Sequence, residues 1–530
     1  MKELIINGKI IFIISILFIL VVATVFSLFN FQYNYRGIFT NISNTNQKSI
    51  NKGFTDNIDG FIDAKDVSEL MEQKQFKNNA NDIIIDMITP DLKRLVDIND
   101  FKDLKKRMEL HTNLWRFLFG QYDTLGYKKY KKLLIENSDF LSQSDIKDLD
   151  YDRKILAILH QTLYPWLYHH HFNGLKDIIL NSKGKGIVIC AGNKHIRMVR
   201  STLDTLRNVI HTKLPIHIFY NGEEDLTKEN QEMLQKEFED VTVQDITIFF
   251  DNSIVKIGGW SIKPFGILAC PFEEVILIDA DAMYIHDPIE FFDEEGYRTT
   301  GTLFFRDRTI LPGPNEGTRW LKSWMDDPLP ETRKLRFWNE QSFHEFESST
   351  VVVHKLRNIL GLLGAAKLNE QKMRDDVVYK YVYGDKETFW IGFDLAREHY
   401  YQSSIPCGFI GSVREDLNSG ERKLCGHIGH ALSNGHFIYW NEHIVRDKTN
   451  IIGESSLLQF KEYTIDNDHG NWVGNKWECL VIGPINVDEE DQKEKDKEPK
   501  IIPLSKEELK TVETIIAREK KYHFVIPESN

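Results

Sequence analysis

Short apolar runs alternate with helical periods in the middle of the chain, and this alternation limits the fold more than any other feature. Gly186–Ala191 and Pro215–Tyr220 are strongly apolar, and a helical period from Ile196 to Ile210 separates them. A third apolar run, Glu274–Ile278, follows further along the chain. Runs of this length and composition are typical of strands that are covered on both faces. The alternation therefore predicts an α/β fold with a mainly parallel sheet.

Polar side chains follow two of the predicted strands. Asn193 comes after the first run, and Asp279 and Asp281 come directly after the third. In parallel α/β sheets, ligands bind at the carboxyl ends of the strands. Carboxylates placed against an apolar strand need compensation, and a divalent cation such as Mg²⁺ or Mn²⁺ supplies it. A solvated turn at the end of the strand is the alternative, because the Asp-x-Asp pattern is common.

Composition and charge exclude several classes of protein. The chain has 530 residues, of which 42% are apolar and 27% charged, so it is not a disordered, fibrous or polytopic membrane protein. Asp and Glu outnumber Lys and Arg by 79 to 66, and the net charge of −13 lacks the basic footprint of a nucleic-acid-binding protein. Five cysteines are too few for a disulfide scaffold, and the sequence leaves their pairing open.

The segment from Ile10 to Phe29 contains no charged residue. A helix of twenty residues spans about 30 Å, the thickness of the hydrocarbon core of a bilayer. We expect an uncleaved signal anchor rather than a buried helix or a cleaved signal peptide, because the run is long and lacks a clear cleavage site. Lys2 and Lys9 precede the segment, which predicts a cytosolic tail of residues 1–9 and a luminal remainder.

Four segments follow the predicted anchor. Residues 30–79 are rich in polar side chains, which is typical of a flexible stem. Residues 80–180 show helical periods, and residues 181–450 contain the α/β pattern. Residues 451–530 form a C-terminal extension that includes a linker of mixed charge.

Three short patterns stand outside the α/β pattern. Asn41 begins a glycosylation sequon in the predicted stem. His169, His170 and His171 are consecutive, so their side chains diverge, and we expect a structural role rather than a metal site. The segment from Ser505 to Glu508 has the spacing of a capping box, which predicts the start of a final helix.

Blocks of sequence between about residues 185 and 445 resemble the fungal Golgi mannosyltransferase family, which contains α-1,3- and α-1,2-mannosyltransferases. The blocks are Gly259–Leu268 with its continuation into Asp279–Asp281, Thr300–Arg308, Glu347–Val353 and Gly384–Trp390. The block Thr300–Arg308 is most similar to the α-1,3 branch. The resemblance implies a GT-A-like nucleotide-sugar-binding domain in a type II membrane protein. It also implies GDP-mannose as donor, Mn²⁺ as cofactor and retention at the anomeric carbon.

The resemblance also implies how the donor is held. Asp279 and Asp281 would bind the cation, with Asp281 as the direct ligand and Asp279 near the ribose or a bound water. GT-A enzymes often complete the metal site with a histidine, for which His427, His430 and His436 are candidates. His430 matches best, and a structural role is the alternative. Lys263 lies where related enzymes place a lysine near the donor phosphates, although a surface lysine before a turn is the alternative. Asn193 is a further candidate for binding the donor, from its place after the first strand.

Three further carboxylates are candidates for the catalytic groups. Glu347 stands before the last apolar run, where the family commonly has Gly at the position of Ser349. Asp385 and Glu387 lie in a Gly-led turn, for which a solvated charged turn is the alternative. The sequence does not assign a role to any of the three.

The expected function is a Golgi α-1,3-mannosyltransferase that acts on mannose-terminated N- or O-linked glycans of glycoproteins. An α-1,2-mannosyltransferase of the same family is the nearest alternative, and a non-catalytic subunit of a Golgi mannosyltransferase complex is another. A glycoside hydrolase is disfavoured, because Asp279 and Asp281 are one residue apart and hydrolysis requires a separated pair of carboxylates.

Overall fold

The computed structural model describes residues 91–143, 146–168, 173–445, 457–465, 471–474, 478–485 and 499–522. All of them belong to one compact unit of the chain, Asn78–Asn530. The predicted anchor, stem and glycosylation site, the histidine triplet and most of the charged linker lie outside the described residues. Within the described ranges, no helix has the length and apolar character needed to cross a bilayer.

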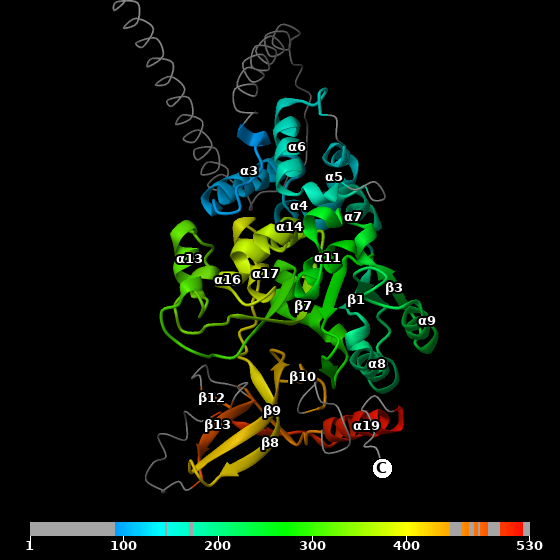
Figure 1. The fold of residues 1–530 in the computed structure, drawn as a ribbon, viewed down its shortest axis with the longest axis vertical. Helices are drawn as coiled ribbons and strands as arrows, with labels where there is room; N and C mark the ends of the chain where they lie inside the picture. The colour runs from blue at the N-terminus through cyan, green and yellow to red at the C-terminus, as the bar shows by residue number, and fades with distance from the viewer. Residues whose placement is uncertain are drawn as a thin grey trace, which may run out of the picture. The chain divides into compact units, whose positions relative to one another are not determined.

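The first sheet has six strands in the order β3-β2-β1-β4-β7-β6 (Figure 1). Its strands are β1 (Lys185–Cys190), β2 (Ile216–Tyr220), β3 (Val241–Asp245), β4 (Glu274–Ile278), β6 (Thr302–Arg306) and β7 (Phe346–His354). The strands from β3 to β4 are mutually parallel, whereas β7 is antiparallel to both of its neighbours. The α/β class and the mainly parallel sheet are confirmed, and the three apolar runs form β1, β2 and β4.

Both faces of this sheet are buried, because alternate residues of each strand point to opposite sides. One face carries Val188, Val275 and Leu277 and packs with residues of α3, α6, α11, α14 and α17. The other face carries Ile187 and Ile276 and packs with residues of α8 and α9. The covering on both sides explains why these strands are continuously apolar in the sequence.

The helices include those expected in the region 80–180. They are α3 (Phe101–Phe119), α4 (Tyr122–Leu125), α5 (Tyr127–Asn137), α6 (Tyr151–Leu163), α7 (Leu175–Asn181), α8 (Ile196–Asp204), α9 (Lys228–Glu237), α10 (Asn252–Val255), α11 (Ile262–Ala269), α12 (Glu295–Thr300), α13 (Glu316–Trp324), α14 (Ile359–Leu368), α15 (Gln371–Met373), α16 (Tyr379–Tyr381), α17 (Lys386–Leu395) and α19 (Lys506–Tyr522). The side chains of Asp100 and Asp150 cap α3 and α6 by accepting hydrogen bonds from backbone N–H groups in the first turn.

A second, antiparallel sheet follows the first, and the sequence did not predict it. Its order is β12-β13-β9-β8-β11-β14, and β10 pairs with β9 and with β5. The strands are β5 (Met283–Tyr284), β8 (Gly408–Asp416), β9 (Glu421–Ala431), β10 (Phe437–Trp440), β11 (Glu462–Ile465), β12 (Trp472–Val473), β13 (Cys479–Pro484) and β14 (Ile501–Pro503). A disulfide joins Cys425 of β9 to Cys479 of β13. The sheet thus contains strands from both sides of residue 450, where a boundary was expected.

The capping box at the start of α19 is confirmed. The backbone N–H of Ser505 donates to Glu508 Oε2 over 2.7 Å, and the N–H of Glu508 donates to Ser505 Oγ over 3.2 Å. The reciprocal pair of hydrogen bonds satisfies two of the N–H groups that a helix start leaves without partners.

We expect acid to destabilise the fold through a buried pair of histidines. His111 on α3 and His160 on α6 share one hydrogen bond, with 3.1 Å between Nε2 and Nδ1. Burial lowers the pKa of His111 to about 3 and also lowers the pKa of His160. Below about pH 6.5 the unfolded chain binds protons at these imidazoles and the folded chain does not. The free energy of unfolding therefore decreases as the pH is lowered. A histidine with the pKa of His111 lowers the free energy of unfolding by about 2 kcal/mol at pH 5 relative to its value at high pH.

Urea unfolding at pH 7, 6 and 5 tests this expectation. The double variant His111→Gln/His160→Gln should show a weaker dependence of stability on pH than the wild type. The matched control is His399→Gln, because His399 is exposed. Equal pH dependence in the wild type and the double variant would contradict the prediction.

Candidate functional site

The segment after β4 carries Asp279 and Asp281 and is held on two sides. The backbone N–H of Asp279 donates to the carbonyl of Ser349 on β7 over 2.7 Å. The carbonyl of Asp281 accepts a hydrogen bond from the N–H of His443, which follows β10, also over 2.7 Å. Both partner residues are distant from the segment in the sequence. The Ala282 N–H also donates to the Asp279 carbonyl over 3.1 Å, so a local turn and tertiary contacts together fix the two aspartates.

Lys263 on α11 is the cation nearest to Asp279. Its Nζ lies 2.8 Å from Asp279 Oδ1 and 3.8 Å from Asp385 Oδ2, and it donates to the carbonyl and the hydroxyl of Ser348, each over 3.1 Å. The side chain is 7% exposed, so the alternative of a surface lysine does not hold. Burial alone would lower the pKa of Lys263, but the two aspartates raise it above its usual value. The structure thus brings three of the predicted residues together.

Negative charge exceeds positive charge in this group. Burial raises the pKa of Asp279 to about 7, against the lowering effect of Lys263 and with a further contribution from Asp281. Burial also raises the pKa of Asp385. Asp385 Oδ2 is buried and accepts no hydrogen bond from the residues that the structure describes. Asp279 and Asp385 face one ammonium, and Asp281 is close enough to act on Asp279, so the group as a whole favours a further cation or donor.

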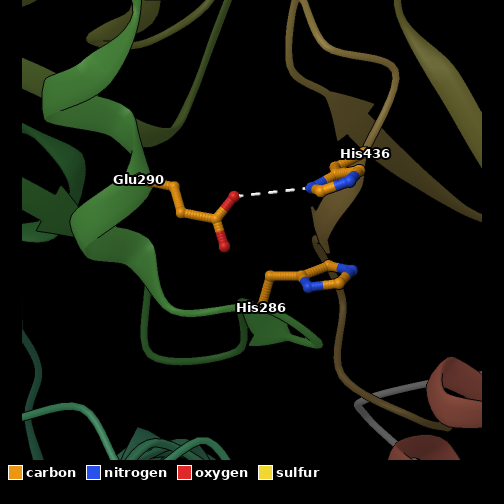
Figure 2. Close-up of side chains that lie close together, drawn as sticks. All are labelled: His286, Glu290 and His436. Atoms are coloured by element: carbon orange, nitrogen blue, oxygen red, sulfur yellow. Dashed lines mark ion pairs between the residues drawn. The ribbon is translucent and has the colours of Figure 1, made fainter.

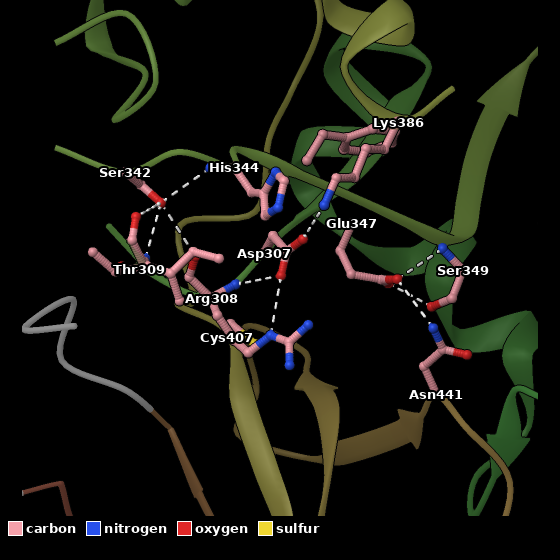
Figure 3. Close-up of polar contacts among 12 residues, drawn as sticks. Asp307, Arg308, Thr309, Ser342, His344, Glu347, Ser349, Lys386, Cys407 and Asn441 are labelled. Atoms are coloured by element: carbon pink, nitrogen blue, oxygen red, sulfur yellow. Dashed lines mark hydrogen bonds and ion pairs between the residues drawn. The ribbon is translucent and has the colours of Figure 1, made fainter. Parts of the chain in front are cut away.

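Glu347 on β7 forms a second group of polar contacts (Figure 3). Its carboxylate accepts hydrogen bonds from the N–H and the hydroxyl of Ser349, from the Tyr439 hydroxyl and from Asn441 Nδ2. Burial alone would raise the pKa of Glu347, but His430 and Ser349 lower it below its usual value. Glu347 is therefore a buried carboxylate that stays ionised at neutral pH.

His430 on β9 faces Glu347. Its Nε2 lies 3.4 Å from Glu347 Oε2, and the ring lies between those of Phe305 and Tyr439, with centroids 4.9 and 5.0 Å away. The geometry does not make a hydrogen bond, and Nε2 is buried without another partner among the described residues. The contact that the structure shows for His430 is thus with a candidate catalytic carboxylate, and its role as a metal ligand stays a prediction.

An irregularity in β7 directs the two serines between these groups. Phe304 of β6 pairs with Val351 of β7, but the next residue, Phe305, pairs with Glu347. Extra residues of β7 are therefore left without a partner on β6 at this point. Such bulges change the direction in which side chains point. Ser348 then contacts Lys263, and Ser349 contacts Glu347. Ser349 lies within a strand and has no positive φ, so the absence of the family's glycine does not strain the backbone.

The three charged residues at the start of α17 point in different directions. Asp385 faces Lys263, whereas Lys386 Nζ lies 2.7 Å from Asp307 Oδ2. Glu387 accepts hydrogen bonds from the Glu345 N–H over 2.9 Å and from Trp390 Nε1 over 2.5 Å. Asp385 and Glu387 are buried, so a solvated turn is excluded. The catalytic role expected of Glu387 stays a prediction, and its contacts join α17 to β7.

Asp307 belongs to a group that the sequence analysis did not single out (Figure 3). Burial would raise its pKa, but Lys386 and Arg308 hold it far below the usual range. His344 lies beside these charges, and burial together with Lys386 lowers its pKa to about 3. The resemblance block Thr300–Arg308 was a signal for this group, since it contains both Asp307 and Arg308.

Asn193 contacts α9 rather than the aspartates. Its side-chain oxygen accepts hydrogen bonds from the Thr227 N–H over 3.1 Å and from Asn230 Nδ2 over 2.8 Å. These contacts stabilise the start of α9, and a role in donor binding stays a prediction.

A buried polar group behind Asp281 was also missed. His443 Nε2 lies 2.7 Å from Ser201 Oγ and 3.2 Å from Glu519 Oε1, on the final helix α19. The backbone of the same histidine holds Asp281. The sequence carries no signal for this group, because α8, the segment after β10 and α19 meet only in the folded chain.

Comparison with known proteins finds a family model and relatives that match this region. A family model described as "Mannosyltransferase putative" matches residues 184–431, which include β1, β4, β7, Asp279 and Glu347. This region is similar to the mannosyltransferase family that the model describes.

The names of proteins related to this region include two activities. Alpha-1,3-mannosyltransferase MNT3 of Saccharomyces cerevisiae is 28% identical over 321 residues, covering 53% of this chain and 50% of the relative. Alpha-1,2-mannosyltransferase MNN23 of Candida albicans is 25% identical over 342 residues, covering 55% of each. The chain spans about half the length of the curated relatives that it matches. A solved structure of core-mannan synthase A from Aspergillus fumigatus, in its Mn/GDP form, covers 41% of this chain and 72% of that chain at 12% identity. Its TM-score of 0.24 is too low to establish a shared fold.

The contacts of Glu387 predict that its replacement affects stability. In Glu387→Gln, an amide group would face the N–H donor of Glu345 or Trp390, which should lower the free energy of unfolding by about 1–3 kcal/mol. Urea unfolding measures this loss. Glu316→Gln is the control, because the side chain of Glu316 is exposed at the start of α13. An unchanged stability of Glu387→Gln would contradict a structural role.

Proposed function

We propose that the protein transfers mannose from GDP-mannose to mannose-terminated N- or O-linked glycans of glycoproteins, forming α-1,3 linkages with retention. One observation carries the proposal. The region that is similar to the mannosyltransferase family contains, at the carboxyl end of β4, a buried group of carboxylates with more negative charge than Lys263 neutralises. The α-1,2 linkage is the second candidate, because a relative with that activity in its name also matches.

The residues present fit a hard divalent cation such as Mn²⁺. Asp279, Asp281 and Asp385 offer carboxylate oxygens, which such ions prefer, and a buried oxygen of Asp385 accepts no hydrogen bond from the described residues. Both oxygens of Asp279 approach Lys263 Nζ. Asp281 stays the expected direct ligand, as the family resemblance implies. The bound cation would offset the charge that develops on the departing diphosphate of a GT-A-like enzyme.

The chain's own residues have separate roles in this proposal. Lys263 neutralises and orients Asp279, and its Ser348 contacts hold the ammonium in place. Glu347 presents an ionised carboxylate to the sugar, where it stabilises positive charge on the anomeric carbon or orients the acceptor hydroxyl. Ser349, Tyr439 and Asn441 fix its direction, so the carboxylate need not reorganise as charge develops.

We further propose that the protein is anchored in the Golgi membrane by Ile10–Phe29, with its catalytic part in the lumen. The support is the uncharged segment itself and the disulfide between Cys425 and Cys479, because disulfides persist in oxidising compartments. Assembly with other mannosyltransferases is part of the same proposal and rests on the resemblance alone.

Asp281→Asn should abolish transfer while leaving the fold intact. The substitution keeps the shape of the side chain but removes the charge that a cation requires, so we expect a loss of at least about 100-fold. The assay measures mannose transfer from GDP-mannose to a mannobiose acceptor with Mn²⁺, and linkage analysis of the product separates α-1,3 from α-1,2. Asp293→Asn is the matched control, since Asp293 is exposed. Full activity of Asp281→Asn, or no transfer by a well-folded wild type, would overturn the proposal.

Glu347→Gln should lower kcat more than it raises KM. A neutral amide cannot stabilise developing positive charge, but it occupies the same space and can bind the same substrates. A loss of at least about 100-fold in kcat is expected. Steady-state kinetics with varied GDP-mannose gives both constants. A change confined to KM would show that Glu347 contributes to substrate binding alone.

A further inference from the structure

Two histidines and a glutamate meet at the surface, apart from the residues described above (Figure 2). His286, Glu290 and His436 each offer one ligand atom, and these atoms all lie within 4.8 Å of one another. His436 Nδ1 is 3.6 Å from Glu290 Oε2. The rings of His286 and His436 stack with 5.2 Å between their centroids and 14° between their planes. The two imidazoles thus face each other and the carboxylate rather than solvent alone.

Ordered segments of backbone hold these side chains. His286 follows β5, and Glu290 lies in the short helix Pro288–Asp293, which the side chain of Asp287 caps. His436 ends the turn between β9 and β10, where its carbonyl accepts a hydrogen bond from the Leu432 N–H over 2.8 Å. The three ligands therefore come from two segments that are far apart in the sequence and are placed before any cation arrives.

A second carboxylate stands beside the group. Glu508 on α19 places Oε1 3.4 Å from His286 Nε2, while its Oε2 accepts the capping hydrogen bond from Ser505. The same region is hollowed into a groove with a volume of about 800 Å³, lined by His286, His436 and Glu508 among others. A cation here would have space for a water or small ligand and a neighbouring carboxylate that orients a bound imidazole.

We propose that His286, Glu290 and His436 bind a divalent cation of the Zn²⁺ class. Two imidazole nitrogens and one carboxylate oxygen are a ligand set that Zn²⁺ accepts readily. Magnesium and manganese prefer sets made of oxygen alone, as at Asp279 and Asp281. This site shares no residue with the proposed donor site, and it does not depend on the proposed function.

The cation would stabilise the contact between the segment after β5 and the β9–β10 turn, next to the final helix. Its ligands join the segment after β5 to the β9–β10 turn, and Glu508 adds α19. The same helix carries Glu519, which contacts His443, whose backbone holds Asp281. Binding should therefore raise the thermal unfolding midpoint of the protein.

Calorimetric titration of the metal-free, full-length protein with Zn²⁺ alone tests the proposal. We expect His436→Ala and His286→Ala each to lose one equivalent of bound Zn²⁺ relative to the wild type, together with the rise in unfolding temperature. His399→Ala is the matched control, because His399 is also exposed and also faces one carboxylate, Glu331, over 2.6 Å. It should bind Zn²⁺ as the wild type does.

Co²⁺ absorption gives a second readout that does not require the alanine variants to be equally stable. The wild type should show the visible bands of Co²⁺ bound by imidazole, and the conservative variant His436→Gln should lose them. Zn²⁺ binding that is unchanged in all variants, or lost equally in His399→Ala, would overturn the proposal. A wild type that binds the histidine-dependent equivalent but transfers no mannose would overturn only the proposed function.

Discussion

The buried ammonium of Lys263 is the interaction on which the candidate site depends. It joins α11 to Asp279 after β4, to Ser348 on β7 and to Asp385 at the start of α17. Removing an ammonium from water is costly, and only good geometry with several partners offsets that cost. The carboxylates need Lys263 for the same reason, since without it Asp279 would lose its nearest cation and the buried Asp385 would keep Lys386 as its neighbouring cation. The position of this side chain therefore fixes where the elements around it can lie.

The second sheet completes the site rather than standing beside it. β5 follows Asp281 directly and pairs with β10, so the segment with the two aspartates enters the second sheet as soon as it leaves the first. β9 brings His430 to Glu347, and β10 brings Tyr439 to the same carboxylate. The polar groups around Glu347 thus come from both sheets. Any change that separates the sheets would expose the Glu347 carboxylate, whose orientation burial and its hydrogen-bond donors now fix.

Much of the first sheet could be predicted because its strands are covered on both faces, which makes β1, β2 and β4 continuously apolar. The aspartates could be located for the same reason, since they end one of these strands. The second sheet could not, because β9 begins with charged residues and carries glycines and histidines instead of a regular alternation. Residues 385–387 show a different limit. Their charges were visible, but the sequence does not reveal that Asp385 faces Lys263, Lys386 faces Asp307 and Glu387 faces β7. The group of Ser201, His443 and Glu519 had no local signal at all.

The net charge of −13 gives no preference for a negatively charged donor, so any such preference must arise locally. The two cation sites that we propose differ in the way that local chemistry requires. Around Asp281 the ligands are oxygen atoms and the surroundings are buried, which favours a hard ion that also accepts phosphate oxygens. Around His286 and His436 the ligands are mainly nitrogen and the side chains are partly exposed, which favours a borderline ion with a structural role. Because the two sets share no residue, one chain can hold both ions, and loss of one ion need not remove the other.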